Sequence, residues 1–387
     1  MQNNKKDIHV VFLSSWYPTR MQPTNGDFVV RHAQAVSAFC TTSVIHLAYD
    51  ANLTTFFQLE KRESATVSEY IYYFRLPCYA KLLKPMWFLL MYRKAIRTYI
   101  ATNGKPHLVH VNVMFPVVIV AFLCKLLYKI PYVITEHWTG YLASASQSLG
   151  RFKKCYVRFF SRASSRIMPV SNDLQRALQS HGVKGKYSII HNVVDTSLFF
   201  PSKIKDTAHI RIMHISHLRN EHKNIVGILR VCAQIFTTNP HVILQIVSEN
   251  NPSYVQEYIQ ELGIQNNVQL LGYKNRQDLA AVLSKASYLL LFSNYENFPC
   301  VIVEALACGI PIVSSNVGGI SEHVSEQNGL LVEAGNETEL RTAIERMNNT
   351  YMNYDSALLH AYAVQHFSYY SVGAKIYDVY KEIVKYD

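Results

Sequence analysis

The sequence lacks a hydrophobic run long enough to cross a bilayer. Its longest apolar stretch, residues 113–124, contains Pro116 and is followed by Lys125, whereas a membrane-spanning helix needs about 20 apolar residues. The first residues include no small-residue cleavage site after an apolar core, so a secretion signal is not indicated. We therefore expect a cytoplasmic protein in which residues 113–124 form a buried strand and helix.

Cysteines and acidic residues are both scarce. The seven cysteines are odd in number and show no paired short spacing, which argues against a disulfide framework and against a zinc ribbon. With 38 Lys and Arg against 27 Asp and Glu, the net charge is +11, which predicts an anionic partner. Nucleic acid is disfavoured because neither an RNA-binding aromatic–glycine signature nor a zinc-finger spacing is present.

The basic residues gather in two clusters that also contain many aromatic side chains. Such clusters are typical of amphipathic helices that lie on anionic lipid, but Lys and Arg stems also cover aromatic residues on ordinary soluble helices. Both interpretations stay open at this stage. The clusters comprise Lys81, Lys84, Arg93, Lys94 and Arg97 with Trp87, Phe88, Tyr92 and Tyr99, and Arg151, Lys153, Lys154, Arg158, Arg162 and Arg166 with Phe152, Tyr156, Phe159 and Phe160.

At 387 residues the chain exceeds the size of a single core, and its pattern predicts two α/β domains. Apolar strand patterns alternate with helical patterns through residues 1–195 and again through 210–360, joined by a polar linker at 196–209. The predicted strands are 8–13, 42–48, 108–113, 132–135, 166–170, 187–190, 210–215, 241–247, 268–271, 288–292 and 310–314. Residues 361–387 are expected to end in a helix that packs back toward the N-terminal domain.

Residues 293–309 are the most informative part of the sequence. An apolar strand pattern precedes them, and Pro299 fits the first position of a helix that Gly309 ends. The backbone amides of residues 297–300 would then point from the positive end of the helix toward an anion. Glu296 and Glu304 bracket this helix start, where each taken alone could be a solvated or dipole-stabilising carboxylate.

Together with Pro311, Ser314 and the pair Gly318-Gly319, this segment resembles the donor-site signature of retaining family-four glycosyltransferases with the GT-B fold. The resemblance covers nearly the whole chain. Ser15-Trp-Tyr-Pro18 and Gly26-Asp-Phe-Val-Val-Arg31-His32 are similar to the N-terminal loop and helix start of that family. Thr135-Glu136-His137 and Asn192-Val-Val-Asp195 fall at its interdomain histidine and its Asn-Gly-Val-Asp segment. The resemblance implies two Rossmann-like domains that face each other across a cleft.

The resemblance also implies a site for a nucleoside diphosphate sugar. Glu296 would bind sugar hydroxyls, Glu304 would bind the ribose, and Lys223 would meet the phosphates. His137 would reach into the cleft from the N-terminal domain. The implied catalytic residues are His137, Glu296 and Lys223, and the implied donor-binding residues are Gly26, Arg219, Lys223, Glu296, Asn297, Phe298, Cys300, Val301 and Glu304.

The loop before Lys223 departs from the family pattern. His217 stands where the family has an arginine, and Arg219 follows two residues later as a possible substitute. A zinc site is one interpretation of the four possible ligands in this loop, His214, His217, Glu221 and His222. It is disfavoured because alternate residues of a strand point to opposite faces of the sheet, so these ligands would not converge. No two aspartates lie two residues apart, so the manganese motif of another glycosyltransferase class is missing. We expect no metal or other cofactor.

These features predict a metal-independent retaining hexosyltransferase that acts on a glycan or lipid-linked glycan, in the manner of cell-surface polysaccharide biosynthesis. A peripheral contact with an anionic membrane accompanies this prediction. The alternatives are a nucleotide-sugar epimerase or an inverting transferase of the same fold, and a non-catalytic module that binds anionic lipid.

Overall fold

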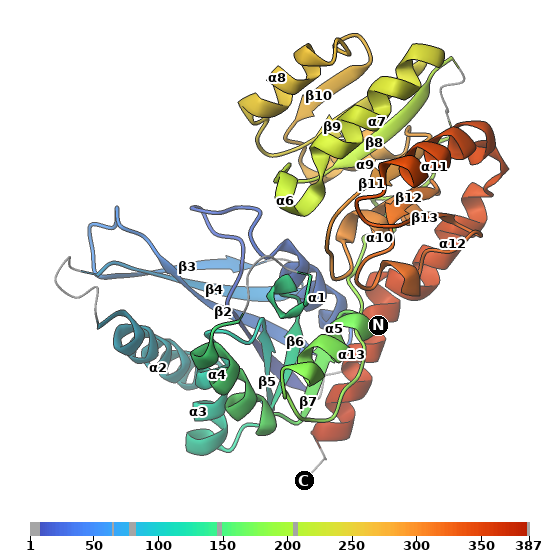
Figure 1. The fold of residues 1–387 in the computed structure, drawn as a ribbon. Coiled ribbons are helices and arrows are strands. Elements are labelled where there is room, and N and C mark those ends of the chain that lie inside the picture. Colours follow the sequence, from blue (N-terminus) through green and yellow to red (C-terminus); the bar gives the residue numbers. More distant parts are fainter. Residues whose placement is uncertain (1–7, 64–65, 77–82, 145–148, 204–207, 385–387) are drawn as a thin grey trace.

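The protein consists of two α/β lobes that follow one another along the chain (Figure 1). The computed structural model describes residues 8–63, 66–76, 83–144, 149–203 and 208–384. Each lobe is built on one sheet with helices on its faces, which confirms the predicted fold class of two doubly wound Rossmann-like domains.

The first sheet has seven strands in the order β3-β4-β2-β1-β5-β6-β7. All neighbours pair in parallel except the edge strand β3, which runs antiparallel to β4. Its strands are β1 His9–Ser14, β2 Thr41–Tyr49, β3 Phe57–Glu63, β4 Val67–Phe74, β5 Leu108–Asn112, β6 Tyr132–Glu136 and β7 Arg166–Pro169.

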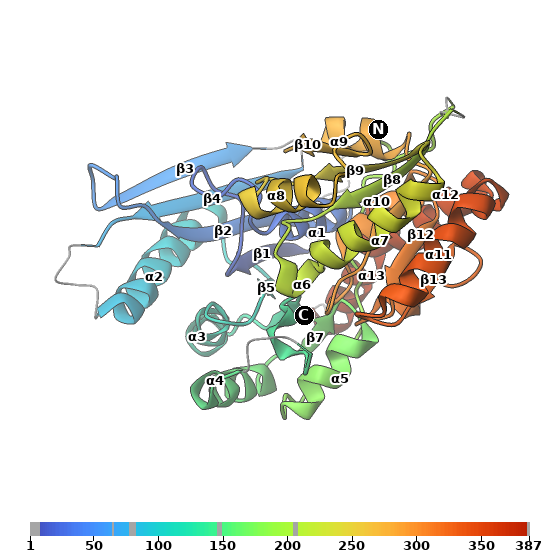
Figure 2. The same cartoon turned by 45° about the horizontal axis from the view of Figure 1, so that its top comes forward.

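The helices of the first lobe divide between the two faces of this sheet (Figure 2). Helix α1 Asp27–Ser37 covers one face, where it packs against the last helix of the chain. On the other face lie α2 Lys84–Asn103, α3 Val118–Tyr128 and α4 Arg151–Arg162. The turn η2 Thr139–Tyr141 and helix α5 Asn172–Ser180 follow β6 and β7.

The second sheet is parallel throughout, in the order β10-β9-β8-β11-β12-β13. Its strands are β8 Ile210–Ile215, β9 Val242–Val247, β10 Val268–Gly272, β11 Tyr288–Leu291, β12 Ile312–Ser315 and β13 Gly329–Val332. The helical segments of this lobe are α6 Asn220–Lys223, α7 Ile225–Thr238, α8 Ser253–Glu261, α9 Arg276–Leu283, α10 Cys300–Ala307, η3 Ile320–Glu322, α11 Glu337–Thr350 and η4 Tyr351–Asn353. Because the strands of a parallel sheet are buried on both faces, the sequences of these strands are short runs of apolar residues.

The last two helices connect the lobes. Helix α12 Ser356–Phe367 packs on α10 of the second lobe, and α13 Tyr369–Ile383 packs on α1 of the first. The chain therefore returns to the N-terminal lobe at its end (Figure 1). None of the helices in the described part of the chain is both long enough and apolar enough to cross a bilayer.

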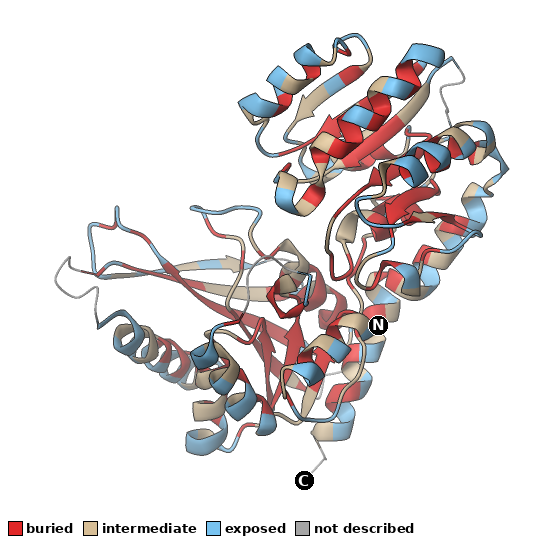
Figure 3. Ribbon diagram, viewed as in Figure 1, coloured by how far each residue is buried: buried red, intermediate tan, exposed pale blue. Residues whose placement is uncertain are grey.

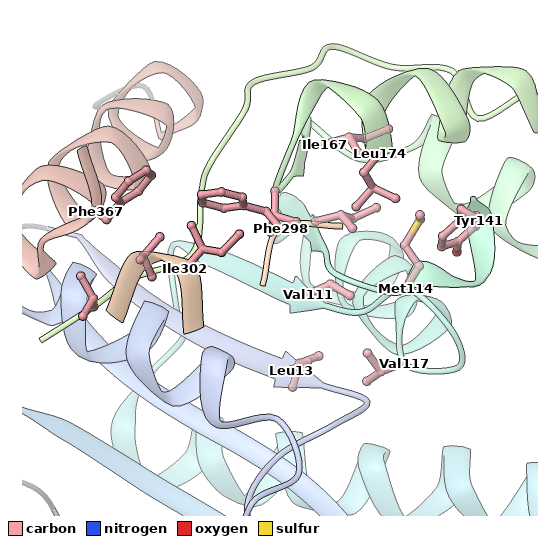
Figure 4. Packing of buried hydrophobic residues seen from close by; sticks show 14 of the residues in the cluster. Leu13, Val111, Met114, Val117, Tyr141, Ile167, Leu174, Phe298, Ile302 and Phe367 are labelled. Carbon is pink, nitrogen blue, oxygen red and sulfur yellow. The ribbon is translucent and has the colours of Figure 1, made fainter. Parts of the chain in front are cut away.

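One hydrophobic cluster continues from one lobe into the other. Buried residues of the first sheet, such as Leu13 and Val111, belong to the same cluster as Phe298, Ile302 and Phe367 of the second lobe (Figure 4). The central strands of both sheets are buried, whereas the edge strands β3 and β10 are mostly exposed or half-buried (Figure 3). The two lobes thus share part of one hydrophobic core.

Three details differ from the sequence-based prediction. Residues 187–190 run beside β7 and make backbone hydrogen bonds to it, but they form only a single bridge, between Tyr187 and Ile167. Pro169 lacks the N–H that would continue the ladder. Strands β3, β4 and β13 were not predicted, and helix α10 begins at Cys300, which makes Pro299 its N-cap rather than its first residue.

Candidate functional site

The side chains of Glu296 and Lys223 meet in the second lobe, although 73 positions separate them in the sequence. Lys223 ends the short helix α6 after β8, and Glu296 lies in the loop between β11 and α10. The Lys223 Nζ donates to Glu296 Oε1, and the Ser293 hydroxyl donates to the same oxygen at 2.8 Å. Both charged side chains are buried, so this contact is a desolvated ion pair.

Glu296 is held in its ionised form. Burial alone would raise its pKa, but Lys223 and His222 outweigh burial and lower the pKa to about 2. The His222 Nε2 lies 3.6 Å from Glu296 Oε1. A permanent carboxylate at this point accepts hydroxyl donors well, as a sugar-binding residue must.

Two histidines, His222 and His217, lie on one side of the pair. The His222 ring stacks on Tyr295 with centroids 4.3 Å apart, and its Nδ1 lies 3.1 Å from His217 Nε2. Burial and the neighbouring Lys223 lower the pKa of His217 to about 4. Arg219, the predicted substitute for the family arginine, is exposed at the start of α6, and its backbone N–H donates to His217 Nδ1 at 3.2 Å.

His137 approaches the same loop from the first lobe. Its backbone carbonyl accepts a hydrogen bond from Asn297 Nδ2, and its ring packs on Phe28 at 4.2 Å. Burial, with His32 and His110 nearby, holds the pKa of His137 well below its ordinary value. Within the part of the chain that the structure describes, the buried Nε2 of His137 has no hydrogen-bond partner. A neutral ring nitrogen is therefore available at the boundary of the lobes.

Glu136 fixes the backbone on which His137 stands. Its Oε1 accepts the N–H groups of His137 and Trp138, and its Oε2 accepts that of Met114, each at 2.9 Å. The side chain is fully buried, and burial raises its pKa to about 7 against the effect of these donors. Glu136 thus ties the ends of β5 and β6 together at the edge of the sheet that faces the second lobe.

Glu304 meets the first lobe through a buried ion pair. Its Oε1 lies 2.7 Å from the Arg31 guanidinium of α1, and their side chains are only 2% and 7% exposed. Arg31 also pairs with Asp27 at 2.6 Å and donates to the Val193 carbonyl at 3.3 Å. The ribose contact predicted for Glu304 remains a prediction, and any such contact must share the carboxylate with Arg31.

The other predicted residues lie at the start of α1, in the loop before α10 and in the first turn of α10. Gly26 caps α1 with φ 78°, and a Cβ there would lie 2.4 Å from the Trp16 carbonyl oxygen. Phe298 points into an aromatic cluster with Phe367, while its carbonyl accepts from Asn192 Nδ2 at 2.6 Å. Cys300 and Val301 begin α10, and Val301 packs on the hydrophobic core.

The structure thus brings Glu296, Lys223, Asn297 and His137 together, and it places Arg219 at the rim of the same region. Sequence reasoning missed the contacts of His222 and Ser293 with Glu296, and it named Arg31 without giving it a role. The adjacency of His222 to Lys223 was a usable signal, but nothing in the sequence indicated which side of the short helix would face Glu296.

A cavity of about 570 Å³, lined by apolar residues and by the charged side chains of Lys154, Asp173 and Arg176, lies at the boundary of the lobes. Its walls come from η2, α4 and α5 of the first lobe and from Val317 and Gly318 of the second. Gly318 has φ 59°, and a Cβ there would lie 1.8 Å from the Glu296 carbonyl oxygen, so the loop of this cavity touches the loop of the candidate site.

Two family models match most of the chain. The model described as "Glycosyltransferase Family 4" matches residues 48–198, and the one described as "Glycosyl transferases group 1" matches residues 196–356. An N-acetyl-alpha-D-glucosaminyl L-malate synthase of Bacillus anthracis is 28% identical over 254 residues, which is 62% of this chain and 64% of that protein. An uncharacterized glycosyltransferase of Methanocaldococcus jannaschii is 25% identical, over 62% of this chain and 66% of the relative.

Solved structures share the fold over nearly the full length. Sucrose-phosphate synthase from Thermosynechococcus elongatus superposes with a TM-score of 0.77 at 18% identity, covering 97% of this chain and 99% of that one. Anabaena HepE in complex with UDP gives a TM-score of 0.74 at 18% identity, covering 97% and 100%. At these identities the likeness shows the fold alone, and that fold is GT-B.

Proposed function

Because the chain belongs to the family-four glycosyltransferases with the GT-B fold, we propose that it is a retaining, metal-independent hexosyltransferase. Its donor is a nucleoside diphosphate hexose, and its acceptor is a glycan or a lipid-linked glycan of cell-surface polysaccharide type. Catalysis takes place on the cytoplasmic side of a membrane. The observation that carries this proposal is the buried contact of Lys223 with Glu296 beside the unpartnered His137 nitrogen.

The donor sugar binds between Glu296 and His137. Glu296 Oε1 already accepts from Lys223 and Ser293, which leaves the second oxygen of a permanent carboxylate for sugar hydroxyls. His137 is neutral, so its Nε2 exchanges a hydrogen bond with the sugar without repelling Lys223. Titration does not disturb either contact near pH 7, because both pKa values lie far below it.

The departing diphosphate develops negative charge that fixed donors must stabilise. Lys223 supplies a cation that is already in place, and α10 begins four residues after its partner Glu296, so its N-terminal amides add a positive end near the leaving group. Arg219 and the histidine pair at 217 and 222 border the loop, where they extend the set of donors. Side chains therefore provide the positive charge that this leaving group needs.

Retention follows if the acceptor hydroxyl attacks from the side of the leaving group and its proton passes to the departing phosphate oxygen. The C1–phosphate bond breaks, the C1–acceptor bond forms on the same face, and no separate general base is needed. The inter-lobe cavity at Gly318 is where the acceptor binds. Arg176 and Asp173 on α5, which pair at 3.2 Å, offer charged contacts there to a polyol.

A screen of nucleoside diphosphate sugars tests the proposal. A donor at 100 times its dissociation constant should stabilise the protein by about 2.7 kcal/mol, which a thermal shift detects. Turnover with that donor should fall roughly a hundredfold in Glu296→Gln and in Lys223→Ala, the scale of losing one preorganised polar contact. Glu345→Gln, on the exposed face of α11, is the matched control.

Four outcomes decide between the proposal and its alternatives. Near-normal turnover in both site variants contradicts the site, and the anomeric configuration of the product separates retention from inversion. Release of nucleotide without any acceptor points to hydrolysis or epimerisation. Activity that survives a chelator supports the metal-independent mechanism, and activity that needs added divalent metal refutes it.

A further inference from the structure

The positive charge of the protein is concentrated in one segment. Residues 70–172 contain fifteen Lys and Arg and a single acidic residue, Glu136, which gives this segment +14, while the rest of the chain carries −3. Glu136 is fully buried and held by backbone amides, so it does not offset the surface charge. The segment includes helices α2, α3 and α4, none of which contains an acidic residue.

These three helices lie side by side on one face of the first sheet, which we name the α2–α4 face (Figure 1). The face carries the Lys and Arg of the three helices and several exposed large apolar side chains. Among the described residues, none of its Lys and Arg forms an ion pair with a carboxylate. The exposed apolar residues are Met86, Leu90, Leu126, Leu127, Phe152 and Phe159.

An apolar groove of about 330 Å³ opens between α2 and α3. Met86, Leu90 and Leu127 line it and are 48%, 44% and 65% exposed, whereas soluble helices usually turn such side chains inward. Arg93 is the one Lys or Arg among its lining residues. The groove thus combines an apolar floor with a cation, which is the pairing that an acyl chain with a phosphate headgroup requires.

The direction of the groove follows from the sheet. β4 runs parallel to β2, and β5 runs parallel to β1 and β6, so α2 and α3, which follow β4 and β5, both start at the carboxyl edge of the sheet. This is the edge where His137 and Glu136 lie and where the second lobe sits. One end of the groove therefore opens on the side of the candidate site.

We propose that the α2–α4 face docks on an anionic phospholipid bilayer, with one acyl chain of a lipid entering the α2–α3 groove. Charge complementarity selects this occupant: each Lys or Arg near an anionic leaflet contributes about 1 kcal/mol, and the face combines cations that have no carboxylate partner among the described residues with exposed apolar side chains. An acidic protein surface would complement the charge of this face, but it would not fill a groove whose lining residues, apart from Arg93, are apolar or aromatic. Docking would place the acceptor lobe, and the mouth of its cavity, at the membrane surface.

Vesicle flotation with the full-length protein tests this docking and needs no turnover. The wild type should float with vesicles that contain phosphatidylglycerol, should not float with pure phosphatidylcholine, and should release as NaCl rises. Arg93→Glu combined with Arg97→Glu should weaken partitioning more than tenfold, since four units of charge change at the surface. Leu90→Ser, which removes one of the exposed apolar side chains that line the groove, should weaken partitioning at low salt, where the charges still attract the protein to the vesicles.

The controls lie on the second lobe. Lys285→Glu and Tyr273→Ser change an exposed cation and a 57% exposed aromatic there, and they should float as the wild type does. Each variant should keep the melting temperature and the donor-induced thermal shift of the wild type, which separates docking from folding and from the proposed activity. Equal flotation with both kinds of vesicle, wild-type flotation of the double Arg variant, or equal loss in the second-lobe controls overturns the proposal. Binding to RNA or to an acidic protein without flotation overturns it as well.

Discussion

Lys223→Met should destabilise the second lobe by about 3 kcal/mol at pH 7, because it leaves the Glu296 carboxylate buried without its cation. Lys223 and His222 lower the pKa of Glu296 from 4.5 to about 2, and 2.5 units correspond to about 3 kcal/mol. Breaking a buried ion pair by removing one partner typically costs 3–5 kcal/mol, which agrees. For a carboxyl group whose pKa is lowered, this stability is present above pH 4.5 and is lost as the pH falls toward 2.

A melting curve and a double-mutant cycle measure the effect. A lobe of this size loses about 2–4 °C per kcal/mol, so the melting temperature of Lys223→Met should fall by about 6–12 °C at pH 7. The loss should be smaller at pH 5, since the unpaired buried carboxyl then takes up a proton. Adding Glu296→Gln should recover part of the loss because no buried charge is left alone. Additive losses in the double variant would show that the two side chains do not interact, and the reasoning would fail.

Three other substitutions test the loops of the site. Gly318→Ala should lower both the turnover and the melting temperature, because the added Cβ would lie 1.8 Å from a carbonyl oxygen. Gly335 also has a positive φ but has open space around it, so Gly335→Ala should lower the free energy of unfolding in urea by only about 1–2 kcal/mol, through backbone strain. Arg31→Met should destabilise the protein by about 3–5 kcal/mol, because it leaves the buried Glu304 carboxylate without its cation. A smaller loss of stability in the double variant with Glu304→Gln would support the ion pair. Glu136→Gln should lose less stability than the wild type between pH 4.5 and 7, because a carboxyl whose pKa is raised to about 7 costs stability as it ionises.

Both sheets could be predicted because their central strands are buried on two faces and read as apolar runs. One edge strand that was missed breaks this rule, and one predicted strand does not complete a ladder. β3 carries Glu60, Lys61 and Arg62 on an exposed edge and pairs antiparallel, so it has no apolar run to reveal it. The segment at 187–190 has the apolar pattern of a strand but lies beside Pro169, which ends the ladder.

The candidate site was predictable as a set of residues but not as a set of contacts. The carboxylates, the lysine and the histidine could each be assigned from local patterns that match known motifs. Their pairing depends on loops 73 and 160 positions apart, as in Lys223–Glu296 and Asn297–His137. Local patterns carry no information about which oxygen of Glu296 remains open, or about the arginine that meets Glu304.

The two acidic residues differ in how they tie helix α10 to the rest of the protein. Glu296, before the helix, is bound by Lys223 of its own lobe, whereas Glu304, within the helix, is bound by Arg31 of the other lobe. A carboxylate offers about four acceptor positions, so Glu304 can keep Arg31 on Oε1 and still accept a ribose hydroxyl on Oε2. If it does so, a donor along α10 contacts a side chain that also holds the lobes together. Binding the donor and associating the lobes then share one carboxylate, so a change in Arg31 should alter nucleotide affinity as well as stability.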